Sequence, residues 1–231
     1  MRLLVRPPYW RGLRLGVAAG VEHTPVMKAL APATVVDVGA NVGQFSLLMT
    51  ALHPAARIVA FEPMPDAADT YRRLFAGNAN VTLHQLAIAA SAGEAELHVS
   101  ARADSSSLLP IGEGQRTIFP GTEEAGTMQI ATAPLDAVLP AADIARPALM
   151  KIDVQGYELE VLRGAAPLLD RFDHIYVEAS FVPLYDGQPL QDEVAAFLGA
   201  HGFVEQGRYN MSLDADGKPV QADFLFARKP A

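Results

Sequence analysis

The hydrophobic positions of the chain form short runs, separated by longer stretches with helical spacing. Between the runs, residues 43–54, 65–78 and 156–172 have apolar residues spaced as on one face of a helix. The runs themselves are rich in β-branched residues and almost continuously apolar, as in strands buried on both faces of a sheet. This alternation predicts an α/β fold with a doubly wound parallel sheet. The predicted strands are 33–40, 56–63, 81–88, 148–154 and 174–180.

Two regions depart from this alternation. Residues 100–133 are rich in Ser, Gly, Pro and Thr, which predicts an excursion of strand pieces and loops at the rim of a site. Residues 190–202 have the pattern of a helix, and 203–213 and 221–229 that of strands joined by the turn-forming segment DADGKP. A helix followed by a terminal hairpin predicts an antiparallel edge on the parallel sheet.

The length of 231 residues favours one domain. We therefore predict an N-terminal helical or lid segment over residues 1–32 and a single domain over residues 33–231. The chain has 26 acidic and 18 basic residues and a net charge of −8, which argues against a nucleic-acid partner. It contains no cysteine, which excludes disulfide scaffolds, thiolate metal sites and cysteine nucleophiles.

The first fourteen residues are basic and contain no acid. No apolar run approaches the roughly 18 residues that span a bilayer, and Arg11 and Arg14 interrupt the apolar stretch that a signal peptide would need. We therefore expect a cytoplasmic protein. Tyr9 and Trp10 lie among the basic residues, a mixture that can dock on anionic lipid head groups. The alternative, which we favour, is that this segment packs as a lid or pairs in a homodimer. The four basic residues are Arg2, Arg6, Arg11 and Arg14.

A glycine turn follows the first predicted strand, in the sequence VVDVGANVGQF. Gly39 and Gly43 bracket a tight turn into a helix, where backbone amides can face a ligand. A dinucleotide fingerprint needs glycine at two positions that Asn41 and Gln44 occupy here. The turn better suits S-adenosyl-L-methionine, whose amino-acid head is zwitterionic and has no phosphates. The alternative is that the glycines serve only the strand-to-helix geometry.

The next two predicted strands end in residues that could hold the rest of this cofactor. Glu62 ends the second strand, where a carboxylate can accept hydrogen bonds from both ribose hydroxyls. The alternative is a solvated strand-end glutamate. Ala87 and Ile88 end the third strand and could pack on a flat adenine ring, although small apolar residues there are more often core.

Several segments together resemble the FkbM family of S-adenosylmethionine-dependent methyltransferases. They span about Val35 to Phe226 and include VVDVGANVGQF, IVAFEP, SSSLL, LMKIDVQGYELEVLRGA, VEAS and LYDGQPL. The resemblance implies a Rossmann-like class I methyltransferase fold, with a seven-stranded, mostly parallel sheet whose last strand is antiparallel. It also implies methyl transfer to oxygen, typically a hydroxyl of a sugar, polyketide or similar metabolite. Gln155 stands where the family more often has Glu.

The resemblance also assigns individual residues. It matches Glu62 with the acidic residue that binds the ribose and Glu178 with the acidic residue that ends the fifth strand. Asp37, Gly39, Asn41 and Gly43 fall on the cofactor loop, and Ser106 and Ser107 on the serine-bearing segment. Lys151, Asp153, Gly156 and Glu158 fall on the signature of the fourth strand. The candidates for cofactor binding are thus Asp37, Gly39, Asn41, Gly43, Glu62, Ala87 and Ser106.

The catalytic candidates are Asp153, Lys151 and Glu178, near the carboxyl ends of predicted strands, where ligands of such sheets bind. Asp153 is our candidate to receive the proton of an acceptor hydroxyl or to orient it. For proton transfer, its pKa would need raising by burial, or that of the alcohol lowering by a cation. Lys151 points to the same sheet face and could instead pair with an acid. The structural alternative is that Asp153 caps the following helix.

Metal and histidine chemistry are poorly supported by the sequence. Asp153 and Glu178 could share a divalent ion, but the pair alone does not predict a metal site. The six histidines are scattered without ligand spacing. His23 is the exception to watch, because VEHTP precedes the first strand and could fold over the cofactor.

The leading hypothesis is an O-methyltransferase that acts on a hydroxyl of a saccharide or similar metabolite, so the partner is a small-molecule or glycan acceptor. One alternative is a nicotinamide-dependent oxidoreductase, and another is a non-catalytic binding protein on a methyltransferase fold. We expect acceptor specificity to come from residues 100–133 and 181–190, because loops vary in chemistry without altering the fold.

Overall fold

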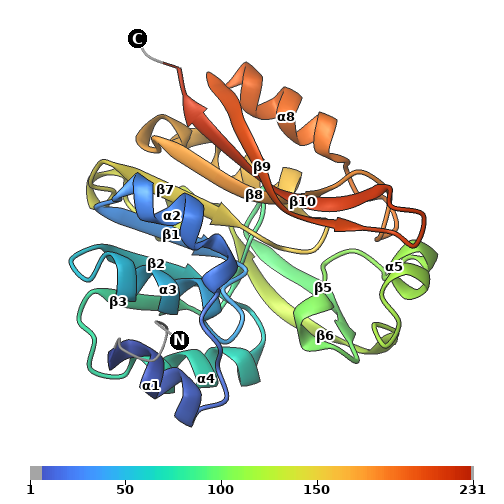
Figure 1. Ribbon diagram of the computed structural model, residues 1–231, viewed down its shortest axis with the longest axis horizontal. Helices are drawn as coiled ribbons and strands as arrows, with labels where there is room; N and C mark the ends of the chain where they lie inside the picture. The colour runs from blue at the N-terminus through green and yellow to red at the C-terminus, as the bar shows by residue number, and fades with distance from the viewer. Residues whose placement is uncertain (1–6, 230–231) are drawn as a thin grey trace.

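The computed structural model describes residues 7–229 and shows a seven-stranded sheet at its centre (Figure 1). The order of the strands is β3-β2-β1-β7-β8-β10-β9, and β10 runs antiparallel to both of its neighbours, β8 and β9, whereas the other pairs are parallel. The predicted doubly wound sheet is thus confirmed. Its antiparallel strand, β10, lies between β8 and β9, and β9 forms the edge of the sheet. The strands are β1 (Thr34–Val38), β2 (Arg57–Phe61), β3 (Val81–His84), β7 (Ala148–Ile152), β8 (His174–Ser180), β9 (Phe203–Leu213) and β10 (Pro219–Arg228).

Helices cover both faces of this sheet. Val35 and Ile58 point to the face where α2 (Thr24–Leu30) and α3 (Gln44–Leu52) pack, and the neighbouring Val36 and Val59 point to the opposite face. Burial on both faces explains why the strands are almost continuously apolar. The other helices that cover the main sheet are α1 (Pro7–Arg14) and α4 (Pro65–Phe75) on the α3 side, and α6 (Leu135–Val138), α7 (Glu158–Ala165) and α8 (Gln191–Ala200) on the opposite side.

A smaller sheet lies beside the main one and contains β5 and β6 next to α5 (Glu113–Ile118) (Figure 1). Its order is β4-β6-β5, from β4 (Ala87–Ile88), β5 (Gly93–Ser100) and β6 (Glu124–Ala133). The strand expected over 81–88 therefore ends at His84 and resumes as β4 in a different sheet. The expected excursion over 100–133 contains α5 and β6, whereas β5 precedes it and was not predicted.

The N-terminal segment is anchored on α4. Arg11 donates hydrogen bonds to the carbonyl oxygens of Ala76 and Arg73, at 2.7 and 2.8 Å. On the same short helix Trp10 and Leu13 are more than half exposed. Two of the four basic residues, Arg2 and Arg6, lie outside the described residues. Docking of residues 1–14 on lipid head groups therefore stays a prediction, as does the division of the chain at residue 32.

None of the helices described between residues 7 and 229 combines the length and apolar character needed to cross a membrane. The helices of the fold instead bury their apolar sides against the sheet. The carboxyl ends of the parallel strands β1, β2 and β7 lie together at one edge of the sheet. This edge is where a ligand of such a fold binds.

Candidate functional site

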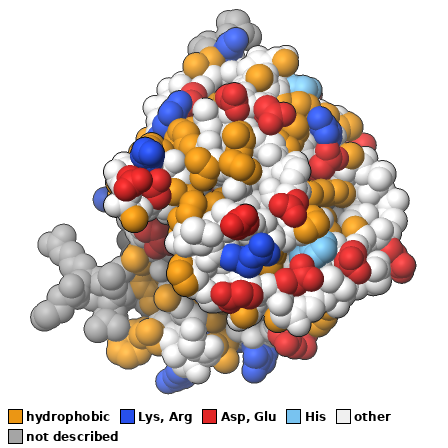
Figure 2. Space-filling view, turned by 90° about the vertical axis from the view of Figure 1, so that its right-hand side faces the viewer, with side chains coloured by type: hydrophobic (Ala, Val, Ile, Leu, Met, Phe, Trp, Pro, Cys, Tyr) orange, Lys and Arg blue, Asp and Glu red, His pale blue; other side chains and the backbone are white. Residues whose placement is uncertain are grey.

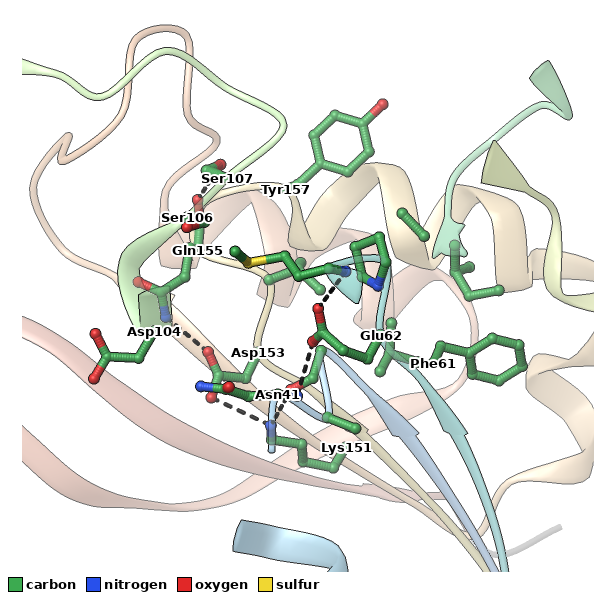
Figure 3. Close-up of a pocket in the computed structure, with 18 of the residues that line it drawn as sticks. Asn41, Phe61, Glu62, Asp104, Ser106, Ser107, Lys151, Asp153, Gln155 and Tyr157 are labelled. Carbon is green, nitrogen blue, oxygen red and sulfur yellow. Dashed lines mark hydrogen bonds and ion pairs between the residues drawn. The ribbon is translucent and has the colours of Figure 1, made fainter. Parts of the chain in front are cut away.

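A cavity of about 220 Å³ opens at the carboxyl ends of β1, β2 and β7 (Figure 3). Its walls come from the 3-10 helix η2 (Val21–His23), the β1–α3 turn, the end of β2, strand β4, the segment after the 3-10 helix η3 (Ala103–Ser105) and the β7–α7 turn. Ligands of open α/β sheets bind at this position. The cavity brings together many of the residues singled out in the sequence: Gly39, Asn41, Glu62, Ala87, Ser106, Lys151 and Asp153.

The β1–α3 turn needs its glycines for close packing. Gly39 has a φ of 78°, and a Cβ there would lie 1.8 Å from the carbonyl oxygen of Asp153. Only glycine lets the ends of β1 and β7 approach so closely. Gly43 has a φ of 99° and packs against Phe75 of α4. Within residues 7–229 the cavity lining includes Gly39 but not Gly43. Gly43 therefore serves the conformation of the turn and its packing on α4, without lining the cavity.

Asn41 links this turn to the end of β2. Its φ is 46°, a left-handed conformation that Asn tolerates better than most residues. Its backbone amide donates a hydrogen bond of 2.8 Å to Oε2 of Glu62, and the amide of Met64 donates one of 2.8 Å to Oε1 (Figure 3). The carboxylate is thereby held in one orientation at the cavity wall.

Glu62 has the features needed to bind a diol. Burial raises its pKa to about 7, although the two backbone amides favour the ionised form. Each carboxylate oxygen has a second lone pair, so both oxygens can still accept a hydrogen bond from a ligand. The glycine turn and this fixed carboxylate fit the amino-acid head and the ribose of S-adenosyl-L-methionine. Ribose binding by Glu62 itself stays a prediction.

Asp37 is completely buried behind the turn, and it is not among the described residues that line the cavity. Its Oδ2 accepts a hydrogen bond of 2.7 Å from Ser46 Oγ, which in turn accepts one from Tyr71. Its Oδ1 has no hydrogen-bond partner among the described residues and lies 3.6 Å from Nζ of Lys151. In this structure Asp37 therefore acts on Lys151 rather than on the cavity directly.

The ammonium group of Lys151 lies against the β1–α3 turn. Its Nζ donates to the carbonyl oxygen of Gly39 at 3.2 Å and lies 3.2 Å from Oδ2 of Asp153 (Figure 3). Burial opposes the charge, but Asp153 and Asp37 outweigh it and raise the pKa of Lys151 above its ordinary value. The expectation that Lys151 pairs with an acid is confirmed.

Asp153 is a poorer base than the sequence indicated. Burial works to raise its pKa, but the charge of Lys151 and a hydrogen bond from Gln155 lower it below the ordinary value. Gln155 Nε2 donates to Oδ1 at 2.7 Å. The capping alternative is wrong, because the residue that precedes α7 is Tyr157, with no side-chain capping bond. Both oxygens of Asp153 are thus engaged within the site.

Glu178 lies behind Asp153 and is not part of the described cavity lining. Gln155 Nε2 also donates to its Oε2, at 2.9 Å, and Gln221 donates to Oε1 at 3.1 Å. Burial and the charge of Asp153 raise the pKa of Glu178 well above its ordinary value. The residues described hold no group of three His, Asp or Glu side chains suited to a metal ion. The Gln155 amide therefore connects the pair that could have shared a cation.

The segment that carries Ser106 and Ser107 lies over the β7–α7 turn. Ser107 Oγ donates a hydrogen bond of 2.6 Å to the carbonyl oxygen of Gln155. Ser106 Oγ accepts one of 3.1 Å from the amide of Ser100, and both serines line the cavity. Ala87 and Ile88 also line it from β4. Packing of these two residues on an adenine ring stays a prediction.

His23 reaches the cavity from η2 and joins a polar group that the sequence did not reveal. Its Nδ1 lies 3.1 Å from the hydroxyl of Tyr176 and 3.4 Å from Oδ2 of Asp223. Asn210 Nδ2 lies 3.1 Å from the same nitrogen. One signal was available, because Asp223 is an acid inside the apolar strand QADFLFARK, and a buried acid needs partners.

Comparison with known proteins places this site in a family. The profile of the methyltransferase FkbM domain matches residues 37–205. Methyltransferase sdnD of Sordaria araneosa is 29% identical over 219 residues, covering 84% of this chain and 81% of that protein. The 2-O-methyltransferase NoeI of Sinorhizobium fredii is 28% identical over 164 residues and 68% of each chain. The hexuronic acid methyltransferase AglP of Haloferax volcanii is 30% identical over 146 residues, 62% of this chain and 54% of that protein.

A solved structure supports the same fold. Sp1610 of Streptococcus pneumoniae, a candidate tRNA (m1A22) methyltransferase solved in complex with S-adenosyl-L-methionine, superposes with a TM-score of 0.52. The match covers 93% of this chain and 75% of that one at 10% identity, so it is informative about the fold alone. The sheet order, the glycine turn and the matched profile agree: this chain belongs to the FkbM family of methyltransferases and has their Rossmann-like class I fold.

Proposed function

We propose that the protein transfers the methyl group of S-adenosyl-L-methionine to a hydroxyl group of a saccharide or similar metabolite. The observation that carries the cofactor assignment is the fixed Glu62 carboxylate, which is hydrogen-bonded to the β1–α3 turn at the cavity wall. Support for the acceptor class comes from the names of two relatives, a 2-O-methyltransferase and a hexuronic acid methyltransferase.

The charge around the cavity supports a cationic methyl donor. Glu22, Glu62, Asp104 and Asp153 line it, and Lys151 is the only Lys or Arg among its described lining residues. A net negative lining favours a sulfonium cation and disfavours the pyrophosphate of a dinucleotide. Asn41 also carries a side chain at a position where pyrophosphate binding needs glycine. The nicotinamide alternative is therefore poorly supported.

Different residues of the cavity have different roles in this reaction. The bound cofactor supplies an electrophilic methyl group on a positively charged sulfur. Glu62 holds the ribose and β4 the adenine. Asp153, an ionised carboxylate fixed by Lys151 and Gln155, orients the acceptor in the cavity. Glu178 supports Asp153 through Gln155, without itself touching the acceptor.

The surface supports an acceptor that is a small molecule or glycan. Figure 2 shows acidic side chains spread over one face of the molecule, with fewer Lys and Arg side chains among them. Together with the net charge of −8 this disfavours nucleic acid, which needs a cationic surface. A homodimer and a cytoplasmic location stay predictions.

Two measurements test the proposal in sequence. Calorimetry with S-adenosyl-L-methionine and, separately, with NAD⁺ should detect binding of the first compound only. Formation of S-adenosylhomocysteine is then measured with a panel of methyl glycosides, including neutral hexosides and a hexuronide, against a control without glycoside. A glycoside-dependent rate supports the proposal. Binding of NAD⁺ alone, or of neither compound, would contradict the cofactor assignment; a cofactor-binding protein that methylates no glycoside would contradict the acceptor class.

A further inference from the structure

His23 is held as a rigid part of the cavity wall. Its ring meets Phe45 and Tyr176 edge-on, with centroids 5.5 Å apart in each case. The side chain is only 15% exposed. Its Nδ1 faces a buried polar group between β8 and β10, whereas Nε2 lies 3.5 Å from Glu22, which also lines the cavity. The two ring nitrogens therefore have different surroundings.

The hydrogen bonds on the Nδ1 side favour one tautomer of His23. The hydroxyl of Tyr176 donates to Oδ2 of Asp223 at 3.0 Å, and Asn210 Nδ2 donates to the same oxygen at 2.7 Å. Burial raises the pKa of Tyr176, so this hydroxyl keeps its proton. With its hydrogen directed at Asp223, the Tyr176 oxygen accepts from Nδ1–H of His23, 3.1 Å away. The Asn210 amide, whose Nδ2 also lies 3.1 Å from Nδ1, then directs its second hydrogen at the Tyr176 oxygen, 3.4 Å away. Nε2 then carries the free lone pair.

We propose that Nε2 of His23 accepts the proton of the acceptor hydroxyl, and that Tyr176 and Asp223 are positioning residues that keep Nδ1 protonated. The proposal rests on the O-methyl transfer proposed above. The acceptor oxygen forms its bond to the methyl carbon as its proton passes to Nε2. The electron pair of the broken carbon–sulfur bond stays on sulfur, which becomes a neutral thioether. Asp153 orients the acceptor and does not compete for this proton, since both of its oxygens already accept hydrogen bonds or an ion pair.

The surroundings of His23 can stabilise the imidazolium formed in this step. Asp223 lies 3.4 Å from Nδ1, and Glu22 lies 3.5 Å from Nε2. A base oriented through its second nitrogen by a buried carboxylate is a common arrangement for proton abstraction. The charged or titratable groups next to His23 are Glu22 on its own segment, Tyr176 of β8 and Asp223 of β10. Farther out, Lys151 and Asp153 line the same cavity, and Tyr209 of β9 packs against Tyr176.

Three variants and a control test the role of His23. His23→Gln removes the base, Tyr176→Phe removes the connecting hydroxyl, and Asp223→Asn removes the carboxylate. His53→Gln is the control, because His53 makes a similar buried contact, 2.9 Å from the carbonyl oxygen of Met27, away from the cavity. Each variant is first checked for folding by circular dichroism and thermal melting.

The first readout separates catalysis from binding, with the methyl glycoside that gives the highest rate in the screen above. His23→Gln should lower kcat at least about 100-fold, as expected for loss of a general base. Its Kd for S-adenosyl-L-methionine should stay within about twofold, and the acidic limb of the pH profile of kcat, measured at saturating cofactor, should disappear. Tyr176→Phe should lower kcat less, and His53→Gln should change neither quantity. An unchanged kcat, or a loss of cofactor affinity that accounts for the lower rate, would overturn the proposal.

The second readout needs neither cofactor nor acceptor. Long-range ¹H–¹⁵N spectra of histidine-labelled protein at pH 8, assigned with His23→Gln, report which ring nitrogen carries the proton. Wild-type protein should show the Nδ1–H tautomer, and Asp223→Asn should shift the mixture toward Nε2–H. An Nε2–H tautomer in wild type would overturn the proposal even if no glycoside is methylated. Absence of cofactor binding with the Nδ1–H tautomer intact would instead refute only the proposed function.

Discussion

The Glu62 carboxylate gives the sharpest test of the cofactor assignment. Glu62→Gln keeps the size of the side chain but exchanges one acceptor oxygen for an NH₂ group. Oε1 and Oε2 each accept a 2.8 Å hydrogen bond from a backbone amide, of Met64 and Asn41 respectively. The variant therefore leaves one of these amides facing a donor, and it loses one of the two positions that would accept from the ribose.

The expected loss follows from the charge on this group. A hydrogen bond to a charged group contributes about 1.5–3 kcal/mol, which corresponds to an increase in Kd of about 10- to 150-fold. The pH dependence follows from the raised pKa, about 7 in the free protein. The carboxylate is the form that accepts from both hydroxyls, and its fraction falls from about 0.9 at pH 8 to about 0.1 at pH 6. Wild-type affinity should therefore weaken about tenfold over this range.

Titration calorimetry with S-adenosyl-L-methionine at pH 6, 7 and 8 checks both numbers. Glu94→Gln serves as the control, because Glu94 is an exposed glutamate on β5 outside the cavity lining. It should reproduce the wild-type affinity and pH dependence, whereas Glu62→Gln should bind weakly with little dependence on pH. Wild-type affinity in Glu62→Gln, or an unchanged pH slope, would refute the assignment of Glu62 to the ribose.

Two further substitutions test the chemistry behind the cavity. Asp153→Asn should lower kcat by at least about tenfold while leaving the cofactor Kd within about twofold, because it removes the charge that orients the hydroxyl; normal turnover would make Asp153 structural. Burial raises the pKa of Glu158 from 4.5 to about 7, so its stabilising contribution is complete below pH 4.5 and is lost as pH rises through 7. Glu158→Gln should thus raise the free energy of unfolding at pH 8 by on the order of 3 kcal/mol, seen as a higher melting temperature, and by less than about 1 kcal/mol at pH 5. Equal shifts at both pH values would contradict this linkage.

Much of the fold could be read from the sequence because the central strands are buried on both faces. The run 33–40 contains β1 at Thr34–Val38, and the run 174–180 coincides with β8. Strand β5 was missed although its alternation was visible, with Ala95 and Leu97 between polar residues. A strand of the small sheet has one exposed side, so it lacks the continuous apolar signal that identified the others.

The site was harder to predict, because a position at a strand end does not say which way a side chain points. Glu62 and Asp153 reach the cavity, whereas Asp37 lies behind it with the same strand-end signature. The contact between Tyr176 and Asp223 depends on the antiparallel register of β8 and β10, in which Glu178 pairs with Asp223. That register joins segments 47 residues apart, which local patterns do not encode.

Gln155 shows how one neutral side chain organises this acidic site. Its Nε2 donates to both Asp153 and Glu178, and its Oε1 lies 3.0 Å from the hydroxyl of Tyr185, which also lies 3.0 Å from the carbonyl oxygen of Ser105. A glutamate here would place a third carboxyl group at hydrogen-bond distance from Asp153 and Glu178, and repulsion between like charges would raise the pKa values of this group further. The amide connects them without adding charge. The same side chain contacts Tyr185 in the loop that follows β8, and Tyr185 contacts the segment after β5. The regions expected to select the acceptor are therefore connected to the carboxylate that orients it.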